Sequence, residues 1–269
     1  MRDQYVHFRC GDAQGTCVTE LESHLDFFLQ KFDEWLTAQP KKIYLERPNL
    51  VAGLRLPPAV RGTESPSDLP VVLKRFGWRS PLHRMASPLS ESKALRSFRI
   101  AVILRRAGVP TPRPLIAWER RRWGIVTASY YITEEIRNST TFRAFSQTSA
   151  GSGPEMKPRL TRLARLVRGM HDAGILHRDL TLGNFLVTTK PTEGNGPYLI
   201  DLSRAVHLGR VPLLLRFIDL ARMKLLDHWP EFFEAYCKGR AEWKRRAPLL
   251  RALVWWRRRR MDLWKRLKV

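Results

Sequence analysis

Short apolar runs separated by turn residues dominate the first half of the chain, and this pattern predicts β-strands. The segments expected to be extended are Tyr5–Thr19, Ile43–Leu56, Val71–Phe76, Trp118–Arg122 and Trp123–Ile136. We expect Gly11–Gly15 to turn the first of these into a hairpin, and Arg120–Arg122 to join the last two. The Pro- and Ser-rich stretch Pro57–Pro70 is expected to be a surface loop.

Helical spacing of apolar residues takes over in the second half. The expected helices are Leu21–Leu36, Ser90–Arg106 and Leu160–Gly174. Two short strands, Phe185–Thr188 and Tyr198–Asp201, precede a remainder that is expected to be helical. Strands gathered in one half and helices in the other favour an α+β protein with two segregated lobes.

Charge distinguishes this chain from an average globular protein. Its 269 residues contain 48 Lys and Arg against 25 Asp and Glu, a net charge of +23. Such an excess indicates an anionic partner: nucleic acid, an acidic membrane surface or a phosphorylated substrate. Three scattered cysteines exclude a disulfide scaffold and a zinc site. No stretch offers the roughly 20 apolar residues of a membrane span, and no secretory signal begins the chain, so we expect a cytosolic protein.

One stretch carries recognisable chemistry. His177-Arg178-Asp179 is followed by four residues and then Asn184, just before an apolar strand. This spacing is typical of the catalytic loop of the protein-kinase fold. Further on, Asp201 ends another apolar strand, where kinases place a metal-binding acid, and Lys74 lies on a strand of the type that holds the phosphate-binding lysine.

These residue types suit phosphoryl transfer. The acceptor hydroxyl must be oriented in line with the phosphate, and Asp179 on a tight loop could accept its proton. Asn184 and Asp201 offer hard oxygen ligands of the kind that Mg²⁺ prefers. His177 is expected to brace the loop from beneath and not to shuttle protons.

The sequence resembles the lipopolysaccharide kinases, enzymes with a protein-kinase-like fold that phosphorylate heptose or 3-deoxy-octulosonate sugars of the inner core in Gram-negative bacteria. The resemblance extends from Lys42 to Tyr236. Besides the catalytic loop, the segments that carry it are Val71–Phe76, Ser92–Arg99, Ala107–Leu115, Tyr131–Glu135, Leu199–Ala205 and Asp219–Arg222. It implies a small, mainly β N-lobe and a mainly helical C-lobe.

The resemblance also implies roles for particular residues. Lys74 would bind the α- and β-phosphates of ATP, and the backbone near Glu134 and Ile136 would meet adenine. Glu91, at the start of a helix, is the glutamate that helix geometry offers to pair with Lys74, and the alternative is that this pair is missing.

For the catalytic loop, the resemblance implies that Asp179 is the catalytic base and that Asn184 and Asp201 hold Mg²⁺. Asp219 would hydrogen-bond the backbone of the loop, or else it is an acid on a helix surface.

Several positions depart from the protein-kinase pattern. Thr181 stands where protein kinases usually carry a lysine, and the Asp-Phe-Gly triplet reads Asp201-Leu202-Ser203. Glu46–Gly53 would have to cover the phosphates with a single glycine, and no Ala-Pro-Glu follows Asp201. These differences count against a protein-phosphorylating enzyme with a regulated activation loop.

The end of the chain is rich in basic residues interleaved with Trp and Leu, with only Glu242 and Asp262 as acids after Lys238. This composition is typical of a helix at an anionic lipid surface. The alternatives are a helix that packs on the C-lobe with solvated arginines, or a nucleic-acid site. The membrane interpretation is preferred over nucleic acid, because a lipid-anchored anionic substrate would explain both features.

We therefore expect four segments: an N-terminal extension (1–40), an N-lobe (41–136), a C-lobe (137–239) and a basic amphipathic tail (240–269). The favoured function is ATP- and Mg²⁺-dependent phosphorylation of a lipopolysaccharide core saccharide at the inner face of the cytoplasmic membrane. The alternatives are a protein or small-molecule kinase of the same fold, and a membrane-associated pseudokinase.

Overall fold

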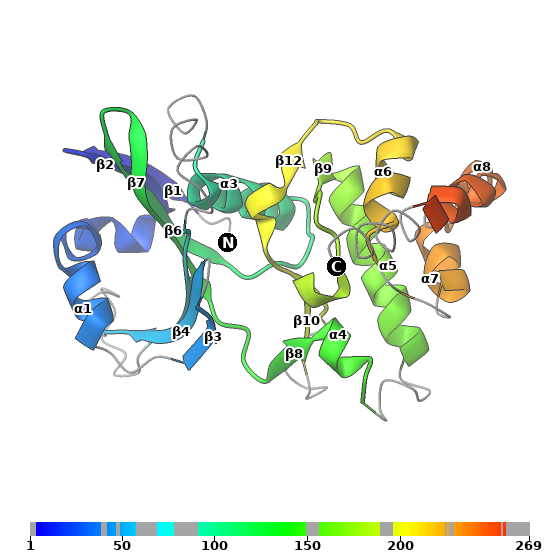
Figure 1. Ribbon diagram of the computed structural model, residues 1–269, viewed down its shortest axis with the longest axis horizontal. Helices are drawn as coiled ribbons and strands as arrows, with labels where there is room; N and C mark the ends of the chain where they lie inside the picture. Colours follow the sequence, from blue (N-terminus) through cyan, green and yellow to red (C-terminus); the bar gives the residue numbers. More distant parts are fainter. Residues whose placement is uncertain are drawn as a thin grey trace, which may run out of the picture. The chain divides into compact units, whose positions relative to one another are not determined.

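The structure is a computed structural model that describes residues 4–38, 42–46, 49–57, 69–77, 91–148, 156–188, 196–223, 225, 229–253 and 255–256. The chain divides into two compact units. The N-terminal unit comprises Met1–Arg106 and Pro112–Ile136, and the C-terminal unit comprises Ala107–Thr111 and Arg137–Val269. A β-sheet dominates the first and helices dominate the second (Figure 1), which confirms the α+β class.

A seven-stranded antiparallel sheet forms the N-terminal unit, in the order β1-β2-β6-β7-β5-β4-β3. Its strands are β1 (Tyr5–Cys10), β2 (Ala13–Val18), β3 (Lys42–Leu45), β4 (Leu50–Leu56), β5 (Leu69–Arg75), β6 (Pro114–Arg122) and β7 (Ile125–Glu134). All the predicted strands of this half are present, and β5 begins earlier than expected. Most of the expected loop Pro57–Pro70 lies outside the described residues.

Both predicted hairpins form: the first turns within the expected Gly11–Gly15 segment, and the second turns after the expected arginines. Only Gly11 and Asp12 separate β1 from β2, and Gly11 has a φ of 58°. Trp123 and Gly124, with φ angles of 51° and 75°, separate β6 from β7. Tight hairpin turns favour positive φ, which Gly adopts without strain. The expected turn at Arg120–Arg122 was therefore wrong, because these arginines continue β6.

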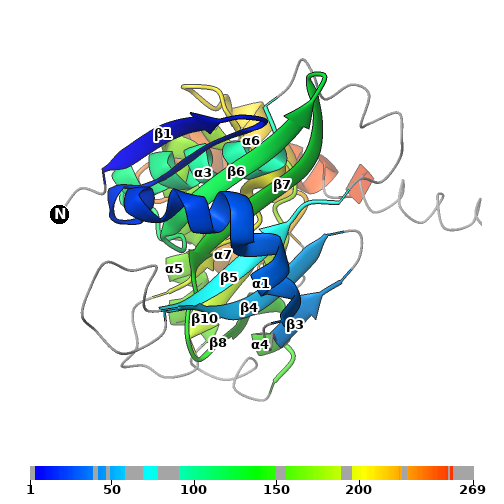
Figure 2. The ribbon, with the colours of Figure 1, turned by 90° about the vertical axis from the view of Figure 1, so that its left-hand side faces the viewer.

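Helices cover both faces of this sheet. On one face lie the 3₁₀-helix η1 (Thr19–His24), the π-helix η2 (Phe27–Lys31) and α1 (Phe32–Ala38), which cross the strands in Figure 2. Phe28 and Phe32 contact Trp118 there, and Trp118 stacks on Tyr130 with 4.6 Å between ring centroids. A second apolar cluster links the sheet to α3 (Lys93–Arg106), which includes the buried Phe98. The first segment is helical as predicted, but it is not one regular α-helix.

The C-terminal unit contains short strands and longer helices. Its elements up to the last strand are β8 (Ser139–Thr141), α4 (Phe142–Phe145), α5 (Met156–Asp172), β9 (Ile175–Leu176), η6 (Leu182–Asn184), β10 (Phe185–Thr188), β11 (Tyr198–Leu199), η7 (Leu202–Arg204) and β12 (Val206–His207). The predicted helix before Gly174 is α5. Gly174 has a φ of 77°, and a Cβ there would lie 2.5 Å from the Gly209 carbonyl oxygen, so the chain turns where no other residue fits.

Three more helices complete the described chain: α6 (Leu213–Leu220), α7 (Trp229–Tyr236) and α8 (Ala241–Arg245), and residues 247–253 are also helical. α5 packs against α7. Within the described residues, no helix has the length and apolar character needed to cross a bilayer. The last part of the predicted basic tail, residues 257–269, lies outside the described residues.

Trp118→Ala tests the packing between the sheet and its N-terminal helices. Trp118 is fully buried, and its removal is expected to lower the free energy of unfolding by about 3–5 kcal/mol, as cavity formation at large aromatic residues does. Urea unfolding measures this change. Trp123→Ala is the matched control, because Trp123 is 87% exposed at the hairpin turn. Equal effects of the two substitutions would contradict the packing described.

Candidate active site

A buried carboxylate fixes the backbone of the loop that begins at His177. Asp219, on α6, accepts hydrogen bonds from the backbone N–H of His177 at 2.8 Å and of Arg178 at 2.9 Å. Arg178 has a φ of 65°, a left-handed conformation that is unfavourable for a residue other than glycine. The two hydrogen bonds therefore hold a strained turn, and they establish Asp219 as a residue that binds the loop, the first of the two alternatives left open by the sequence.

His177 braces the same loop from inside. Its buried ring accepts a hydrogen bond at Nδ1 from the backbone N–H of Asp179, 3.3 Å away. Its Nε2 lies 3.2 Å from the carbonyl oxygen of Ile200, so Nε2 carries the proton and donates. With both ring nitrogens bound to backbone groups, His177 has the structural role that the sequence predicted.

Asn184 and Asp201 lie on neighbouring segments of the same unit. The backbone N–H of Ile200, the residue before Asp201, donates to the Asn184 carbonyl oxygen at 2.9 Å. Asn184 donates its side-chain N–H to the Asp179 carbonyl oxygen at 2.7 Å, which directs its amide nitrogen to the loop and leaves Oδ1 to act as a ligand. Asp201 adopts a left-handed conformation with a φ of 57° and accepts a hydrogen bond from the Ser203 hydroxyl at 2.9 Å.

This donor set fits Mg²⁺. The cation prefers carboxylate and amide oxygens, and it binds through one or two protein ligands while keeping waters or phosphate oxygens. Asn184 and Asp201 supply two such ligands. No cluster of three or more His, Cys, Asp or Glu side chains suited to a metal occurs among the described residues.

Asp179 is accessible, and it has a cationic neighbour. Its carboxylate lies 3.1 Å from a guanidinium nitrogen of Arg204, in an ion pair whose side chains are 35% and 51% exposed. An exposed carboxylate can receive a proton from a bound hydroxyl. The structure therefore brings together, within the C-terminal unit, the three residues that the sequence singled out there.

A buried network supports Asp219 from behind. His171, fully buried at the end of α5, has Nδ1 2.8 Å from the Tyr236 hydroxyl and Nε2 3.5 Å from Asp219. Burial lowers the pKa of His171 below its ordinary value, against the opposing effect of Asp219. Burial alone would raise the pKa of Asp219, but its hydrogen bonds with the His171 ring and the His177 backbone bring that pKa below its ordinary value. Neutral His171 therefore faces an ionised Asp219.

Lys74 lies in the N-terminal unit, near the middle of the sheet. It is on β5 and pairs in register with Val51 on β4 and Tyr131 on β7. Its ammonium group is 5.2 Å from the centroid of the Phe76 ring. A central strand holds its residues in a fixed register, so the lysine has a defined position on the sheet. Its binding to ATP phosphates stays a prediction.

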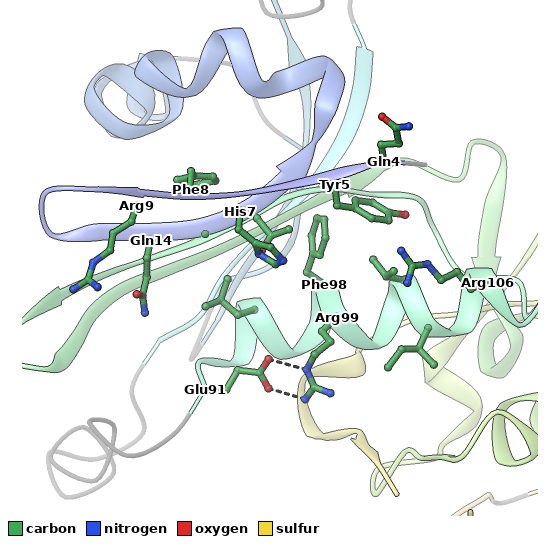
Figure 3. A pocket seen from close by; sticks show the side chains of 15 residues that line it. Gln4, Tyr5, His7, Phe8, Arg9, Gln14, Glu91, Phe98, Arg99 and Arg106 are labelled. Atoms are coloured by element: carbon green, nitrogen blue, oxygen red, sulfur yellow. Dashed lines mark hydrogen bonds and ion pairs between the residues drawn. The ribbon is translucent and has the colours of Figure 1, made fainter. Parts of the chain in front are cut away.

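Glu91 has other partners than the one expected for it. Its carboxylate accepts two hydrogen bonds from Arg99, at 3.0 and 2.8 Å, and lies 3.8 Å from Arg96. Figure 3 shows this bidentate pair at one side of a groove between β1 and α3, with a volume of about 1050 Å³. Of the two alternatives, this arrangement favours the second, in which Glu91 does not pair with Lys74: Glu91 precedes the helix, and its carboxylate is bound by Arg96 and Arg99 of α3. The helix itself contains no acid.

Glu134 is the last residue of β7, and Ile136 is the last residue of the N-terminal unit. Glu134 accepts a hydrogen bond from Arg113 at 3.2 Å, and its backbone N–H donates to the Arg113 carbonyl oxygen. Their contact with adenine stays a prediction. In the segment expected to cover the phosphates, a Cβ on Gly53 would lie 3.3 Å from the Tyr44 ring. The lack of a side chain at Gly53 thus allows the Tyr44 ring to lie close to the backbone of β4.

Sequence reasoning missed three residues that the structure places around this loop: Arg204, Tyr236 and the buried Arg216. Arg216 donates to Asp172 at 2.6 Å and to the Val211 carbonyl oxygen at 2.9 Å. Arg204 directly follows the Asp201-Leu202-Ser203 triplet, and this arginine was the one sequence feature that could have indicated a residue near the site. The hydrogen bond between Tyr236 and His171 spans 65 residues, the one between Arg216 and Asp172 spans 44, and nothing local in the sequence marks either pair.

The chain has one unit built on a sheet and one mainly helical unit, and the helical unit carries the loop, its buried aspartate and the Asn184–Asp201 pair. These features define a protein of the protein-kinase-like class. The fold agrees with the solved structure of WaaP in complex with acyl carrier protein, which is 24% identical in sequence and matches with a TM-score of 0.59 over 90% of this chain and 97% of that one. The chain belongs to the lipopolysaccharide kinase (Kdo/WaaP) family, whose model matches residues 79–234.

Curated relatives agree with the family. A 3-deoxy-D-manno-octulosonic acid kinase of Haemophilus influenzae is 29% identical over 121 residues, which are 44% of this chain and 47% of that protein. The lipopolysaccharide core heptose(I) kinase WaaP of Pseudomonas aeruginosa is 35% identical over 128 residues, 45% of this chain and 47% of that protein. The chain thus spans about half the length of the curated relatives that it matches.

His171 is expected to make stability depend on pH. Its pKa in the folded protein is below the unfolded value of about 6.5, so its contribution is fully present above pH 6.5 and is lost as the pH falls toward the folded pKa. Between about pH 6.5 and 5, the wild type should lose up to about 1.4 kcal/mol per pH unit more than His171→Gln. Urea unfolding at several pH values measures this difference. Parallel pH profiles of the two proteins would show that His171 does not titrate on unfolding.

Proposed function

We propose that this protein transfers the γ-phosphoryl group of ATP to a sugar hydroxyl of the lipopolysaccharide inner core. The observation that carries the proposal is the geometry around Asp179: an accessible carboxylate on a loop that Asp219 holds rigid, next to the Asn184–Asp201 pair. Membership of the family and the names of its curated relatives support the sugar as acceptor.

Asp179 accepts the proton of the acceptor hydroxyl in this proposal. The oxygen so activated attacks the γ-phosphorus, and the bond between that phosphorus and the oxygen bridging to the β-phosphate breaks. Asn184 and Asp201 would hold Mg²⁺, which offsets the negative charge of the phosphates when it is bound. The hydrogen bonds that the loop backbone donates to His177 Nδ1 and to the Asp219 carboxylate keep the Asp179 carboxylate from moving away from the hydroxyl.

The N-terminal unit would contribute nucleotide binding. Lys74 is proposed to bind the α- and β-phosphates, and the backbone near Glu134 and Ile136 to bind adenine, as the family resemblance implies. One observation favours the pseudokinase alternative: Glu91 is bound to Arg99, and α3 has no acid of its own to pair with Lys74. The loop geometry supports the kinase instead, because Asp179, Asn184 and the backbone beside Asp201 are linked by hydrogen bonds within the C-terminal unit.

Asp179→Ala tests the reaction. With purified core oligosaccharide, Mg²⁺ and ATP, the wild type should phosphorylate the saccharide, and the variant should be slower by at least about 10²–10⁴-fold, since it lacks the general base. Transfer of labelled phosphate to the saccharide is measured. Glu231→Gln, which alters an exposed acid on α7, is the matched control and should keep wild-type activity.

Three results would contradict this proposal. Phosphorylated protein without phosphorylated saccharide would favour a protein kinase, and turnover of a small alcohol in place of the core would favour a small-molecule kinase. Equal ATP turnover by wild type and Asp179→Ala would favour a pseudokinase.

We also propose that the protein acts at the inner face of the cytoplasmic membrane, bound through its basic tail. Trp255 and Trp256 are more than half exposed at the end of the described chain, and the residues after them include Arg257, Arg258, Arg259 and Arg260. Trp243, in contrast, packs on the C-terminal unit, 5.9 Å from the Tyr236 ring and 5.0 Å from the Arg216 guanidinium. The membrane-binding part therefore begins after Trp243.

Removal of Val254–Val269 tests this location and preserves the packing of Trp243. The shortened protein should sediment about tenfold less with vesicles of phosphatidylcholine and phosphatidylglycerol, because each basic residue contributes about 1 kcal/mol near an anionic surface. Vesicles of phosphatidylcholine alone are the control, and binding of the full chain should weaken as salt rises. Undiminished sedimentation of the shortened protein would contradict the proposal.

A further inference from the structure

Arg204 is the cation that the structure places at the catalytic carboxylate. It ends the 3₁₀-helix η7, three residues after Asp201, and one of its guanidinium nitrogens lies 3.1 Å from Asp179 Oδ2. The turn that presents it is closed by a hydrogen bond from the Ala205 N–H to the Leu202 carbonyl oxygen at 3.0 Å. Ser203, in the same turn, donates to Asp201. One short element therefore fixes Arg204 relative to both a proposed metal ligand and the proposed base.

A phosphoryl-transfer site needs a cation that is aimed at the transferred group. Negative charge spreads over the equatorial oxygens of the phosphoryl group in the transition state, and an arginine that donates to them accelerates the reaction strongly. Thr181, two residues after Asp179, is neutral, so the catalytic loop itself provides no cation at the place where protein kinases usually carry one. Arg204 reaches the same carboxylate from another segment.

The geometry also leaves Arg204 able to bind a ligand. A guanidinium has five N–H donors arranged in a planar fork, and one contact with a carboxylate oxygen uses only part of them. Half of the side chain is exposed. An ion pair this exposed contributes little to stability, so folding alone gives little reason for it.

We propose that Arg204 is a catalytic residue that donates hydrogen bonds to the transferred phosphoryl group and so replaces the cation missing at Thr181. This role rests on the proposed kinase activity. As Asp179 takes the hydroxyl proton, the new oxygen–phosphorus bond forms, the bond to the leaving oxygen breaks, and its electron pair remains on ADP. Arg204 gains no proton and loses none. It stabilises the negative charge on the oxygens of the phosphoryl group during its transfer.

Kinetics of Arg204→Ala test this role. The variant should lose about 10²–10³-fold in kcat, with less than about threefold change in KM for ATP, because the contact strengthens only in the transition state. Arg162→Ala removes an exposed arginine from α5 in the same unit and should match the wild type. A loss confined to KM would overturn the proposal, as would an unchanged kcat.

A second measurement separates catalysis from a structural role. Affinity for ADP with Mg²⁺ and aluminium fluoride, a mimic of the phosphoryl group in transfer, should fall at least about tenfold in Arg204→Ala, while affinity for ADP alone should not change. Thr181→Lys in the Arg204→Ala background should restore part of kcat. Equal losses of affinity for both ligands, or no recovery with the added lysine, would show that Arg204 only positions Asp179.

The fluoride complex needs no sugar, which keeps the two proposals distinguishable. If no core saccharide is phosphorylated but the complex forms and depends on Arg204, the acceptor is wrong and the role of Arg204 stands. If the saccharide is phosphorylated and Arg204→Ala matches Arg162→Ala in both measurements, the kinase activity stands and the role of Arg204 is refuted.

Discussion

The contact between the Asp219 carboxylate and the backbone of His177 and Arg178 is the constraint on which the candidate active site depends. Arg178 adopts a left-handed conformation that costs about 1–2 kcal/mol for a residue with a side chain. Two hydrogen bonds to an ionised carboxylate exceed that cost, since each contributes about 1.5–3 kcal/mol. With the turn fixed, the N–H of Asp179 meets His177 and the carbonyl oxygen of Asp179 meets Asn184.

What the sequence predicted well was local. Hydrophobic periodicity placed the strands of the N-terminal unit, α3 and α5, and the spacing of Asp179, Asn184 and Asp201 identified the catalytic loop, because a short loop between short strands leaves few ways to arrange its side chains. The turn of the second hairpin was misplaced, since arginines carry little turn preference and Arg120–Arg122 continue strand β6. α4 is too short for periodicity to detect.

What the sequence could not predict involves competition between distant groups. Helix geometry offered Glu91 as the partner of Lys74. In the structure, Arg99 donates one hydrogen bond to each carboxylate oxygen of Glu91, and this arrangement is stronger than a single lysine contact. The bond between His171 and Tyr236 joins α5 to α7, so it exists only once these helices pack. In a chain so rich in arginine, an acid has many candidate partners, and only the folded structure selects among them.

Two of the arginines, Arg216 and Arg204, differ in how deeply their ion pairs are buried. Arg216 is 7% exposed; it is bound to Asp172 and lies over the Trp243 ring, so its charge stabilises the C-terminal unit and is not available to a ligand. Arg204 and Asp179 are accessible, and water screens most of their mutual attraction. Folding stability accounts for the first kind of pair, whereas the second would gain strength if the ligands of the proposed reaction excluded water from it. The same ion pair that contributes little to folding would then act in a low-dielectric site, where a cation close to developing charge has its largest effect.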